Sequence, residues 1–230
     1  MTDKPMTFVL AHGAWWGGDW FWRDVTDRLR AEGHRVFAPV LTGIGPREHL
    51  ASRSVNLTTH IQDIVNLIKW EDLGDIVLVG HSYSGMVVSG VAEQVSEGTI
   101  RSIVFLDAFL PEDGEALSMI ASNFKDLAGD HDPVPPPYAF AGDNEQLKAI
   151  LIKGGTAHPR ACFEEPVRLT GARERIPVKT YVLAAGPVFA RFYDKVKTDS
   201  SWRTERIACG HFPMLERPEE TAAILLRATG

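Results

Sequence analysis

Short runs of apolar and β-branched residues recur along the chain, and most are followed by a segment whose apolar positions have helical spacing. The run Ile76-Val77-Leu78-Val79 is apolar throughout, which is typical of a strand buried on both faces in a parallel sheet. Strands are predicted at residues 7–11, 35–39, 75–80, 102–106, 179–184 and 203–208, and helices at 20–31, 58–70, 84–95 and 218–229. This alternation predicts an α/β fold, with a mainly parallel six-stranded sheet flanked by helices.

One segment, from about residue 112 to residue 175, breaks the alternation. It contains no apolar run that predicts a buried strand, and prolines at 133, 135, 136 and 137 exclude regular structure locally. Its apolar side chains nevertheless argue against disorder. They are Met119, Ile120, Phe124, Tyr138, Phe140, Leu147, Ile150 and Leu151. We therefore predict a core of residues 1–111 and 176–230, with residues 112–175 inserted as a cap over the carboxyl edge of the sheet.

Composition and charge narrow the possible partners. A chain of 230 residues with 44% hydrophobic and 23% charged residues suits one globular domain. The net charge of −6 argues against nucleic acid or an anionic membrane, since neither would be attracted. Cys162 and Cys209 form no disulfide framework, and no Cys/His spacing resembles a zinc site. The first six residues are polar and no apolar stretch is long enough to span a membrane, so we expect a cytoplasmic protein. Nothing in the sequence predicts an oligomeric state.

The strongest chemical signal is the sequence Gly80-His81-Ser82-Tyr83-Ser84, between a predicted strand and a predicted helix. A serine on such a sharp turn projects its hydroxyl above the sheet, and the turn requires small residues two positions away. Gly80 meets this requirement, whereas Ser84 stands where the usual motif has glycine, with Gly85 one position later. A serine that only caps the helix is the alternative. We interpret Ser82 as a nucleophile.

A glycine-rich stretch, His12-Gly13-Ala14-Trp15-Trp16-Gly17-Gly18, follows the first predicted strand. Such a loop can direct backbone N–H groups at the oxyanion of a tetrahedral intermediate. With a nucleophile at Ser82, the expected donors are the N–H groups of Ala14 and Tyr83. Taken alone, the loop is equally compatible with a turn that binds phosphate.

A histidine follows the last predicted strand, in Gly210-His211-Phe212. It comes after the serine, and its loop can reach the serine across the sheet edge, so we predict that His211 is the general base. His12 and His81 flank the motifs and are expected to order the loops. The other histidines have no supporting context; they are His34, His49, His60, His131 and His158.

Together these motifs resemble the α/β-hydrolase fold, and in detail its small esterase branch of plant methyl esterases, hydroxynitrile lyases and bacterial relatives. The similarity covers most of the predicted core and little of the cap. It is carried by residues 12–22, 40–50, 55–72, 75–88, 103–111 and 210–220. The resemblance implies a sheet that lacks the family's first two strands, with the cap inserted after the strand that ends at Leu106.

The chain departs from this family at the acid. Many members carry an aspartate in the loop after the next-to-last strand, where residues 184–187 here contain no carboxylate. Some α/β-hydrolases supply the acid from the strand after the nucleophile, and Asp107 ends that predicted strand 25 residues after Ser82. We therefore predict that Asp107 is the acid, the alternative being that it only caps its loop. The other acids considered are less well placed; they are Glu112, Asp113, Asp194, Asp199 and Glu216.

The resemblance implies that Ser82, His211 and an acid hydrolyse a small-molecule carboxylic ester, with no metal or cofactor. Aromatic residues beside the motifs and in the cap predict a pocket for a hydrophobic or aromatic ester. The predicted lining residues are Trp15, Trp16, Phe109, Phe124, Tyr138, Phe140, Phe212 and Met214.

Two other functions fit the same fold. The family's hydroxynitrile lyases carry a lysine just after the catalytic histidine, and Phe212 at that position disfavours a lyase. A catalytically silent binding protein can keep the same residues, so that alternative stays open. Relatives with a nucleophilic aspartate are excluded by Ser82. Thioesters, amides and lactones are possible substrates of the same machinery.

Overall fold

The computed structural model of the chain describes residues 4–184 and 186–230. Its core is a six-stranded sheet in the order β2-β1-β3-β4-β5-β6, and every neighbouring pair of strands is parallel. The strands are β1 (Thr7–Ala11), β2 (Arg35–Phe37), β3 (Ile76–His81), β4 (Ile100–Leu106), β5 (Val178–Leu183) and β6 (Trp202–Arg206). The predicted α/β-hydrolase sheet is confirmed, and all six strands are parallel.

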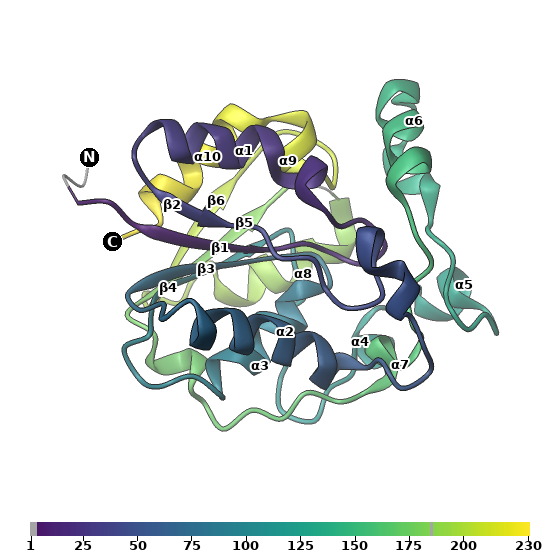
Figure 1. Cartoon of the computed structure of the whole chain (residues 1–230), viewed down its shortest axis with the longest axis horizontal. Coiled ribbons are helices and arrows are strands. Elements are labelled where there is room, and N and C mark those ends of the chain that lie inside the picture. The colour runs from purple at the N-terminus through teal and green to yellow at the C-terminus, as the bar shows by residue number, and fades with distance from the viewer. Residues whose placement is uncertain (1–3, 185) are drawn as a thin grey trace.

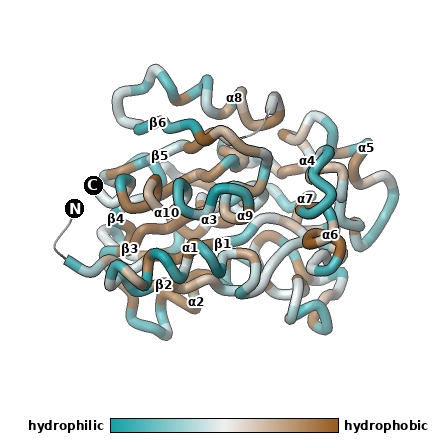
Figure 2. The backbone as a smooth tube through the Cα atoms, turned by 90° about the horizontal axis from the view of Figure 1, so that it is seen from above, coloured by the Kyte–Doolittle hydropathy of each residue, from teal (hydrophilic) through white to brown (hydrophobic). Residues whose placement is uncertain are grey.

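The apolar runs of the sequence lie in the middle of this sheet. Every residue of β3 is buried, and β1 and β4 carry a single half-buried residue each. Figure 2 shows the hydrophobic colouring concentrated on these central strands, with more polar colouring on the surrounding helices. Continuous apolar strands are expected where helices cover both faces of a parallel sheet.

Helices cover both faces (Figure 1). The helices α1 (Asp19–Ala31) and α10 (Pro218–Arg227) pack together on one face, and α2 (Leu57–Trp70) and α3 (Ser84–Ala92) pack together on the other. A further helix, α8 (Gly186–Val196), packs against β5 and β6 and was not predicted from the sequence. Among the described helices, none is long and apolar enough to cross a membrane.

Between β4 and β5 the chain forms short helices with no regular strand. They are α4 (Leu117–Ile120), α5 (Phe124–Ala128), η2 (Tyr138–Ala141), α6 (Glu145–Gly154), α7 (Ala161–Glu164) and η3 (Arg173–Arg175). Figure 1 shows α4 to α7 beyond the carboxyl ends of the strands, where η1 (Gly45–Leu50) also lies. Isolated bridges join Trp16 to Gly155 and Val134 to His158. This segment therefore adjoins the edge at which the strands deliver the predicted site residues.

Candidate active site

Ser82 lies in the turn between β3 and α3, directly after His81 and directly before Tyr83. Its φ of 54° is in the left-handed region that residues other than glycine seldom adopt. The Ser82 carbonyl accepts hydrogen bonds from the N–H groups of Gly85 and Phe109, each at 3.1 Å, and its own N–H donates to Leu106 at 3.3 Å. These bonds hold the strained turn and leave the hydroxyl at the carboxyl edge of the sheet.

Close packing explains the glycines around this turn. A Cβ at Gly80 would lie 2.6 Å from the Ser84 carbonyl oxygen, and a Cβ at Gly85 would lie 1.9 Å from the Phe109 carbonyl oxygen. The tightest approach therefore falls at Gly85, one position after the usual glycine. Ser84 is fully buried, and its hydroxyl donates to the His12 carbonyl, which ties the turn to the loop after β1. A serine thus fits the position where the motif usually has glycine.

The structure brings Ser82, His211 and Asp107 together in one hydrogen-bonded chain. His211 Nε2 lies 2.9 Å from Ser82 Oγ, and His211 Nδ1 lies 2.7 Å from Asp107 Oδ2. Asp107 is fully buried, and its Oδ1 accepts the Ala184 N–H at 2.9 Å. Because a carboxylate accepts the proton on Nδ1, Nε2 is left to accept the serine proton.

The other acids considered from the sequence have different partners. Asp194 pairs with Lys197, Glu112 pairs with Lys195, and Glu216 accepts the N–H groups of Gly210 and Phe212. Of the acidic side chains in residues 4–184 and 186–230, Asp107 is the one that hydrogen-bonds to His211. Asp113 accepts the Leu169 N–H, and Asp199 accepts the Ser201 N–H.

Two neighbours hold the His211 loop and ring. His81 Nε2 donates to the His211 carbonyl at 2.8 Å, and burial holds the pKa of His81 well below its usual value. The His211 ring stacks on Phe189 of α8, with 4.8 Å between ring centroids and an angle of 7° between planes. Phe189 was missed because α8 was not predicted, although its apolar side chains Phe189, Phe192 and Val196 have helical spacing.

The loop after β1 runs against the turn that carries Ser82. A Cβ at Gly13 would lie 2.9 Å from His81 Nδ1 and 3.0 Å from Ser82 Cβ, so a side chain there would displace these neighbours. Within the described part of the chain, the backbone N–H groups of Ala14 and Tyr83 have no acceptor. Both are therefore available as donors beside Ser82, as an oxyanion hole requires.

A cavity with about 450 Å³ of empty space, part of it open to solvent, adjoins Ser82. The described residues of its wall include no charged side chain, and their polar side chains are Ser82, Tyr83 and Asn123. The remaining lining residues are Ala14, Trp15, Phe109, Leu117, Ala121, Leu127, Phe140, Phe163, Val188 and Phe189. Of the eight predicted pocket residues, Trp15, Phe109 and Phe140 thus line this cavity.

The other five predicted pocket residues lie outside the cavity lining. Trp16 is buried, donates its indole N–H to the Leu151 carbonyl at 3.0 Å, and packs edge-on against Phe212 at 5.3 Å. Tyr138 contacts Trp16, and Phe124 contacts the lining residue Phe163. Met214, in the short helix α9 (Pro213–Glu216), is also buried. Sequence position could not separate residues that face the cavity from those behind them.

Two histidines without sequence context, His60 and His158, lie buried behind Tyr83 and Trp15. They belong to α2 and to the loop after α6, two segments that only the folded chain brings together. No sequence motif marks either residue.

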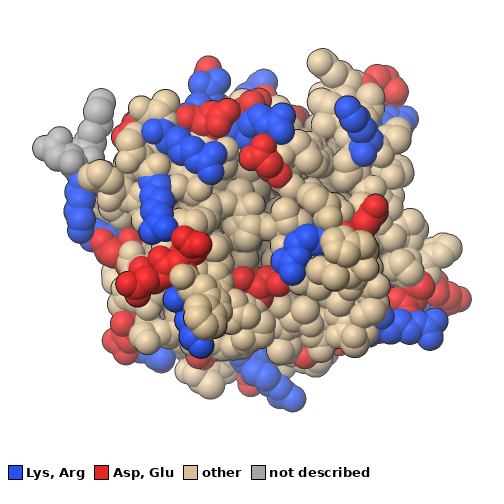
Figure 3. All heavy atoms as spheres, viewed as in Figure 1, with Lys and Arg blue, Asp and Glu red and all other residues tan. Residues whose placement is uncertain are grey.

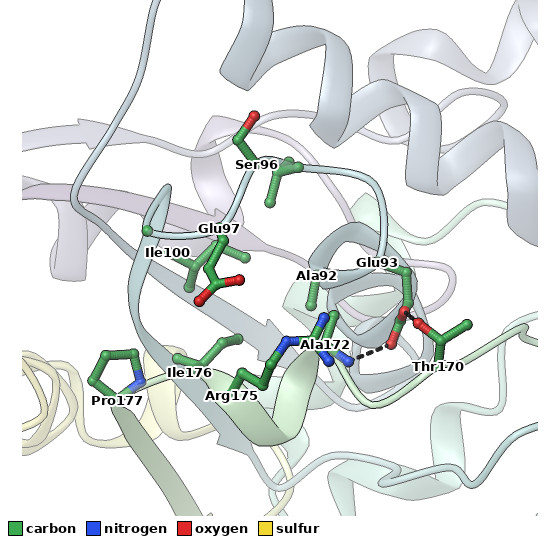
Figure 4. A pocket seen from close by; sticks show the side chains of 12 residues that line it. Ala92, Glu93, Ser96, Glu97, Ile100, Thr170, Ala172, Arg175, Ile176 and Pro177 are labelled. Atoms are coloured by element: carbon green, nitrogen blue, oxygen red, sulfur yellow. Dashed lines mark hydrogen bonds between the residues drawn. The ribbon is translucent and has the colours of Figure 1, made fainter.

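A second cavity lies at the opposite edge of the sheet, near the start of β4 at Ile100 (Figure 4). The carboxylate of Glu93 there accepts hydrogen bonds from Thr170 Oγ1 at 2.6 Å and from the Ala172 N–H at 2.9 Å. Among its lining residues there is no serine paired with a base. On the face that Figure 3 shows, charged side chains of both signs are interspersed around the surface.

Comparisons with known proteins agree with this geometry. A family model described as the alpha/beta hydrolase family matches residues 8–224. A carbendazim-hydrolysing esterase from Nocardioides sp. (strain SG-4G) is 36% identical, over 94% of this chain and 96% of its own length. An α-hydroxynitrile lyase from Arabidopsis thaliana is 30% identical, over 55% of this chain and 49% of its own length.

Among solved structures, an extracellular α/β-hydrolase from a Paenibacillus species has a TM-score of 0.82 and 27% identity. The match covers 97% of this chain and 99% of that one. That hydrolase is described as sharing structural and functional homology with tobacco Salicylic Acid Binding Protein 2.

Proposed function

Because the chain belongs to the alpha/beta hydrolase family and has esterases among its relatives, we propose that it is a serine esterase that works through an acyl-enzyme. The observation that carries this proposal is the chain from Ser82 Oγ through His211 to Asp107, with contacts of 2.9 and 2.7 Å. A serine, a base and an orienting carboxylate in this order form an activated nucleophile.

The proposed reaction has two halves. Ser82 Oγ attacks the ester carbonyl carbon while its proton passes to His211 Nε2, and the carbonyl oxygen becomes an oxyanion held by the N–H groups of Ala14 and Tyr83. The alcohol then leaves with the proton from His211. In the second half, water gives a proton to His211 Nε2 and attacks the acyl carbon. The bond from that carbon to Ser82 Oγ then breaks, the acid leaves, and His211 returns its proton to Ser82 Oγ. Asp107 stays ionised and stabilises the imidazolium at each stage.

The proposed substrate is a small, neutral, hydrophobic or aromatic ester. The part of the cavity wall that the structure describes offers mainly aromatic and aliphatic side chains and no cation that could pair with an anionic acyl group. A charged group placed there would lose its hydration without gaining a partner. The relative from Nocardioides is named for hydrolysing carbendazim, and we carry over to this chain the esterase chemistry alone.

The alternatives have weaker support. The residue after His211 is Phe212, which is fully buried against Trp16, so it places no cation in the site for a lyase. A silent binding protein would lack an activated serine, and labelling with a fluorophosphonate distinguishes that case. The cytoplasmic location and the lack of nucleic-acid or membrane partners stay predictions, and the similar Paenibacillus hydrolase is extracellular.

The test compares the wild type with Ser82→Ala and with Ser201→Ala, which alters an exposed serine. We expect the wild type and Ser201→Ala to hydrolyse 4-nitrophenyl methyl succinate equally, and Ser82→Ala to lose several orders of magnitude in kcat. The wild type should also prefer this neutral ester over 4-nitrophenyl hydrogen succinate by about 10-fold or more in kcat/KM.

Unchanged hydrolysis by Ser82→Ala would refute the serine mechanism. Faster turnover of the charged succinate than of its methyl ester would refute the proposed substrate class while leaving the mechanism intact.

A further inference from the structure

The residue after Ala14 has a strained backbone that several partners hold. Trp15 has φ of 64°, in the left-handed region that a residue with a bulky side chain seldom adopts. Its N–H donates to His158 Nδ1 at 3.3 Å, its carbonyl accepts the Thr156 N–H at 3.0 Å, and its indole N–H donates to the Val134 carbonyl at 3.0 Å. The conformation of the loop that carries the Ala14 N–H therefore depends on acceptors and donors outside that loop.

The second predicted oxyanion donor belongs to a residue that is held in a similar way. The hydroxyl of Tyr83 donates to His60 Nδ1 at 3.0 Å, and His60 Nε2 donates to the Thr42 carbonyl at 2.8 Å. The Tyr83 side chain is buried, and burial raises its pKa well above the usual value, so its hydroxyl stays a donor.

The two histidines are in contact with each other. The rings of His60 and His158 meet edge to face with 5.4 Å between centroids, and the His158 ring lies 5.0 Å from the Tyr83 ring. The His158 ring also stacks on Phe163 at 4.5 Å. One buried cluster thus joins Trp15 on one side of Ser82 to Tyr83 on the other.

We propose that His60 and His158 together set the geometry of the oxyanion hole, His158 by holding Trp15 and His60 by holding Tyr83. Both are positioning residues, since each acts through the residue it holds, and the inference rests on the proposed esterase function. A small displacement of a donor matters because oxyanion stabilisation requires donors already in place when charge develops.

The proposed role requires both histidines to be neutral. His158 Nδ1 and His60 Nδ1 act as acceptors, so the proton of each ring is on Nε2. Burial lowers the pKa of His60 to about 4 and holds the pKa of His158 well below its usual value. A protonated His158 would present an N–H to the Trp15 N–H and lose that bond.

A metal site is the competing explanation for this cluster, because one ligand atom from each of His60, His158 and Cys162 lies within 4.8 Å of the others. The hydrogen bonds argue against it. Both nitrogens of His60 and Nδ1 of His158 already have protein partners, so that among the described residues Nε2 of His158 is the one ring nitrogen of the pair that is buried without a partner. Burial also raises the pKa of the Cys162 thiol far above its usual range. A metal would need that thiol as a thiolate.

The test uses two variants of His158 that separate packing from hydrogen bonding. His158→Asn keeps an acceptor near the position of Nδ1 but loses the ring that stacks on Phe163, whereas His158→Phe keeps a ring but has no acceptor. His34 provides the matched control, because its Nδ1 also accepts a backbone N–H, from Met6 at 3.1 Å, at the far edge of the sheet.

We measure kcat and KM for 4-nitrophenyl acetate, the rate of fluorophosphonate labelling, and the thermal unfolding midpoint. His158→Phe should have a kcat and a labelling rate about 10-fold or more below those of His158→Asn, with similar KM values, because it lacks the acceptor for Trp15. Its unfolding midpoint should equal or exceed that of His158→Asn. His34→Phe and His34→Asn should both match the wild type in kcat.

Tyr83→Phe keeps the ring and provides a second measurement if the His158 variants fold poorly. Loss of the hydrogen bond from the Tyr83 hydroxyl to His60 Nδ1 should lower kcat and leave KM unchanged.

Several results would overturn the inference. The first is a kcat that falls in proportion to the unfolding midpoint across the His158 variants. The second is a kcat of Tyr83→Phe equal to that of the wild type. The third is a stoichiometric amount of metal in the purified wild-type protein. If the wild type neither hydrolyses esters nor reacts with the fluorophosphonate, the proposed function itself fails and this inference fails with it.

Discussion

At the scale of single residues, Ser82 and Asp107 share an unusual backbone conformation. Their φ angles are 54° and 44°, and each is the first residue after its strand, β3 or β4. A positive φ at a non-glycine residue costs on the order of 1 to 2 kcal/mol. Hydrogen bonds from neighbouring segments offset this cost, including the Asp107 N–H to the Val182 carbonyl at 2.7 Å. The strain therefore falls on the two residues whose side chains must both reach His211.

Replacing Asp107 by asparagine tests the role of its carboxylate. Asp107 accepts the Ala184 N–H on one carboxylate oxygen and the His211 Nδ1–H on the other. The amide of asparagine keeps the size of the side chain, but only its oxygen can accept a hydrogen bond. Asp107→Asn should lower kcat by at least about 100-fold, and by up to about 10⁴-fold. Circular dichroism should show a folded protein.

The control for this prediction is Asp194→Asn, because Asp194 is exposed and pairs with Lys197. It should keep a kcat close to that of the wild type. If Asp194→Asn loses most of its kcat while Asp107→Asn keeps nearly all of it, the acid belongs to the later segment that carries Asp194.

Ser82, His211 and Asp107 could be inferred from the sequence because each follows a strand whose apolar run is visible. Parallel strands deliver such residues to one edge of the sheet, so order along the chain was sufficient. His60 and His158 could not be inferred, because their contact depends on how the irregular segment after β4 folds over α2. Phe163 faces the cavity and Phe124 lies behind it, and this difference likewise depends on the tertiary fold.

At the scale of elements, the start of α3 is packed directly against the chain after β4. Gly85 has no room for a side chain, since its Cβ would lie 1.9 Å from the Phe109 carbonyl oxygen. The helix that follows Ser82 and the loop that begins at Asp107 therefore determine each other's position.

The substitution Gly85→Ala should separate these two elements. Overpacking of a tight interior costs about 1 to 3 kcal/mol or more, so the free energy of unfolding should fall by at least this amount, and kcat should fall as Asp107 moves. Gly74→Ala is the control, because nothing lies within 4 Å of its Cβ position. Urea unfolding measures the free energy of unfolding of both variants. If Gly85→Ala is as stable as the wild type, the loop at Phe109 can move to make room for the added methyl group.

The elements themselves were predicted unequally well. The six strands and the helices α1, α2, α3 and α10 were recognised from their spacing, with ends displaced by a few residues; β2, for example, ends at Phe37. The ten-residue helix α6 was not predicted. The helix α8 was missed because it begins at Gly186, and the sequence Gly186-Pro187 favours a turn. The helices α4, α5 and α7 have four or five residues, too few to show a helical repeat.

At the scale of the whole molecule, burial keeps several histidines neutral. It lowers the pKa of His12 and of His60 to about 4, and it holds the pKa of His81 and of His158 well below the usual value. In the unfolded chain these side chains regain a pKa near 6.5. Below that pH the unfolded state binds more protons than the folded state, so acid favours unfolding.

The free energy of unfolding should therefore include the full contribution of these histidines above about pH 6.5, and it should fall as the pH decreases toward 4. Each buried histidine contributes up to about 1.4 kcal/mol per pH unit to this slope. Urea unfolding between pH 7.5 and pH 5 measures it, and His158→Asn should reduce the slope by about one proton. A free energy of unfolding that stays constant over this range would show that these histidines are protonated in the folded protein.

The parallel pairing of β4 with β5 brings together strands separated by residues 107–177. Because the entropy of closing a loop rises only with the logarithm of its length, doubling this crossover would cost about 0.6 kcal/mol. The first residue of the crossover, Asp107, is fastened independently of the interior of the segment, because its N–H donates to the Val182 carbonyl and its carboxylate accepts the Ala184 N–H. Evolution, or an engineer, can therefore lengthen this segment at small thermodynamic cost, provided that Val134, Thr156 and His158 keep their hydrogen bonds to Trp15, while the strands keep Ser82 and Asp107 in register.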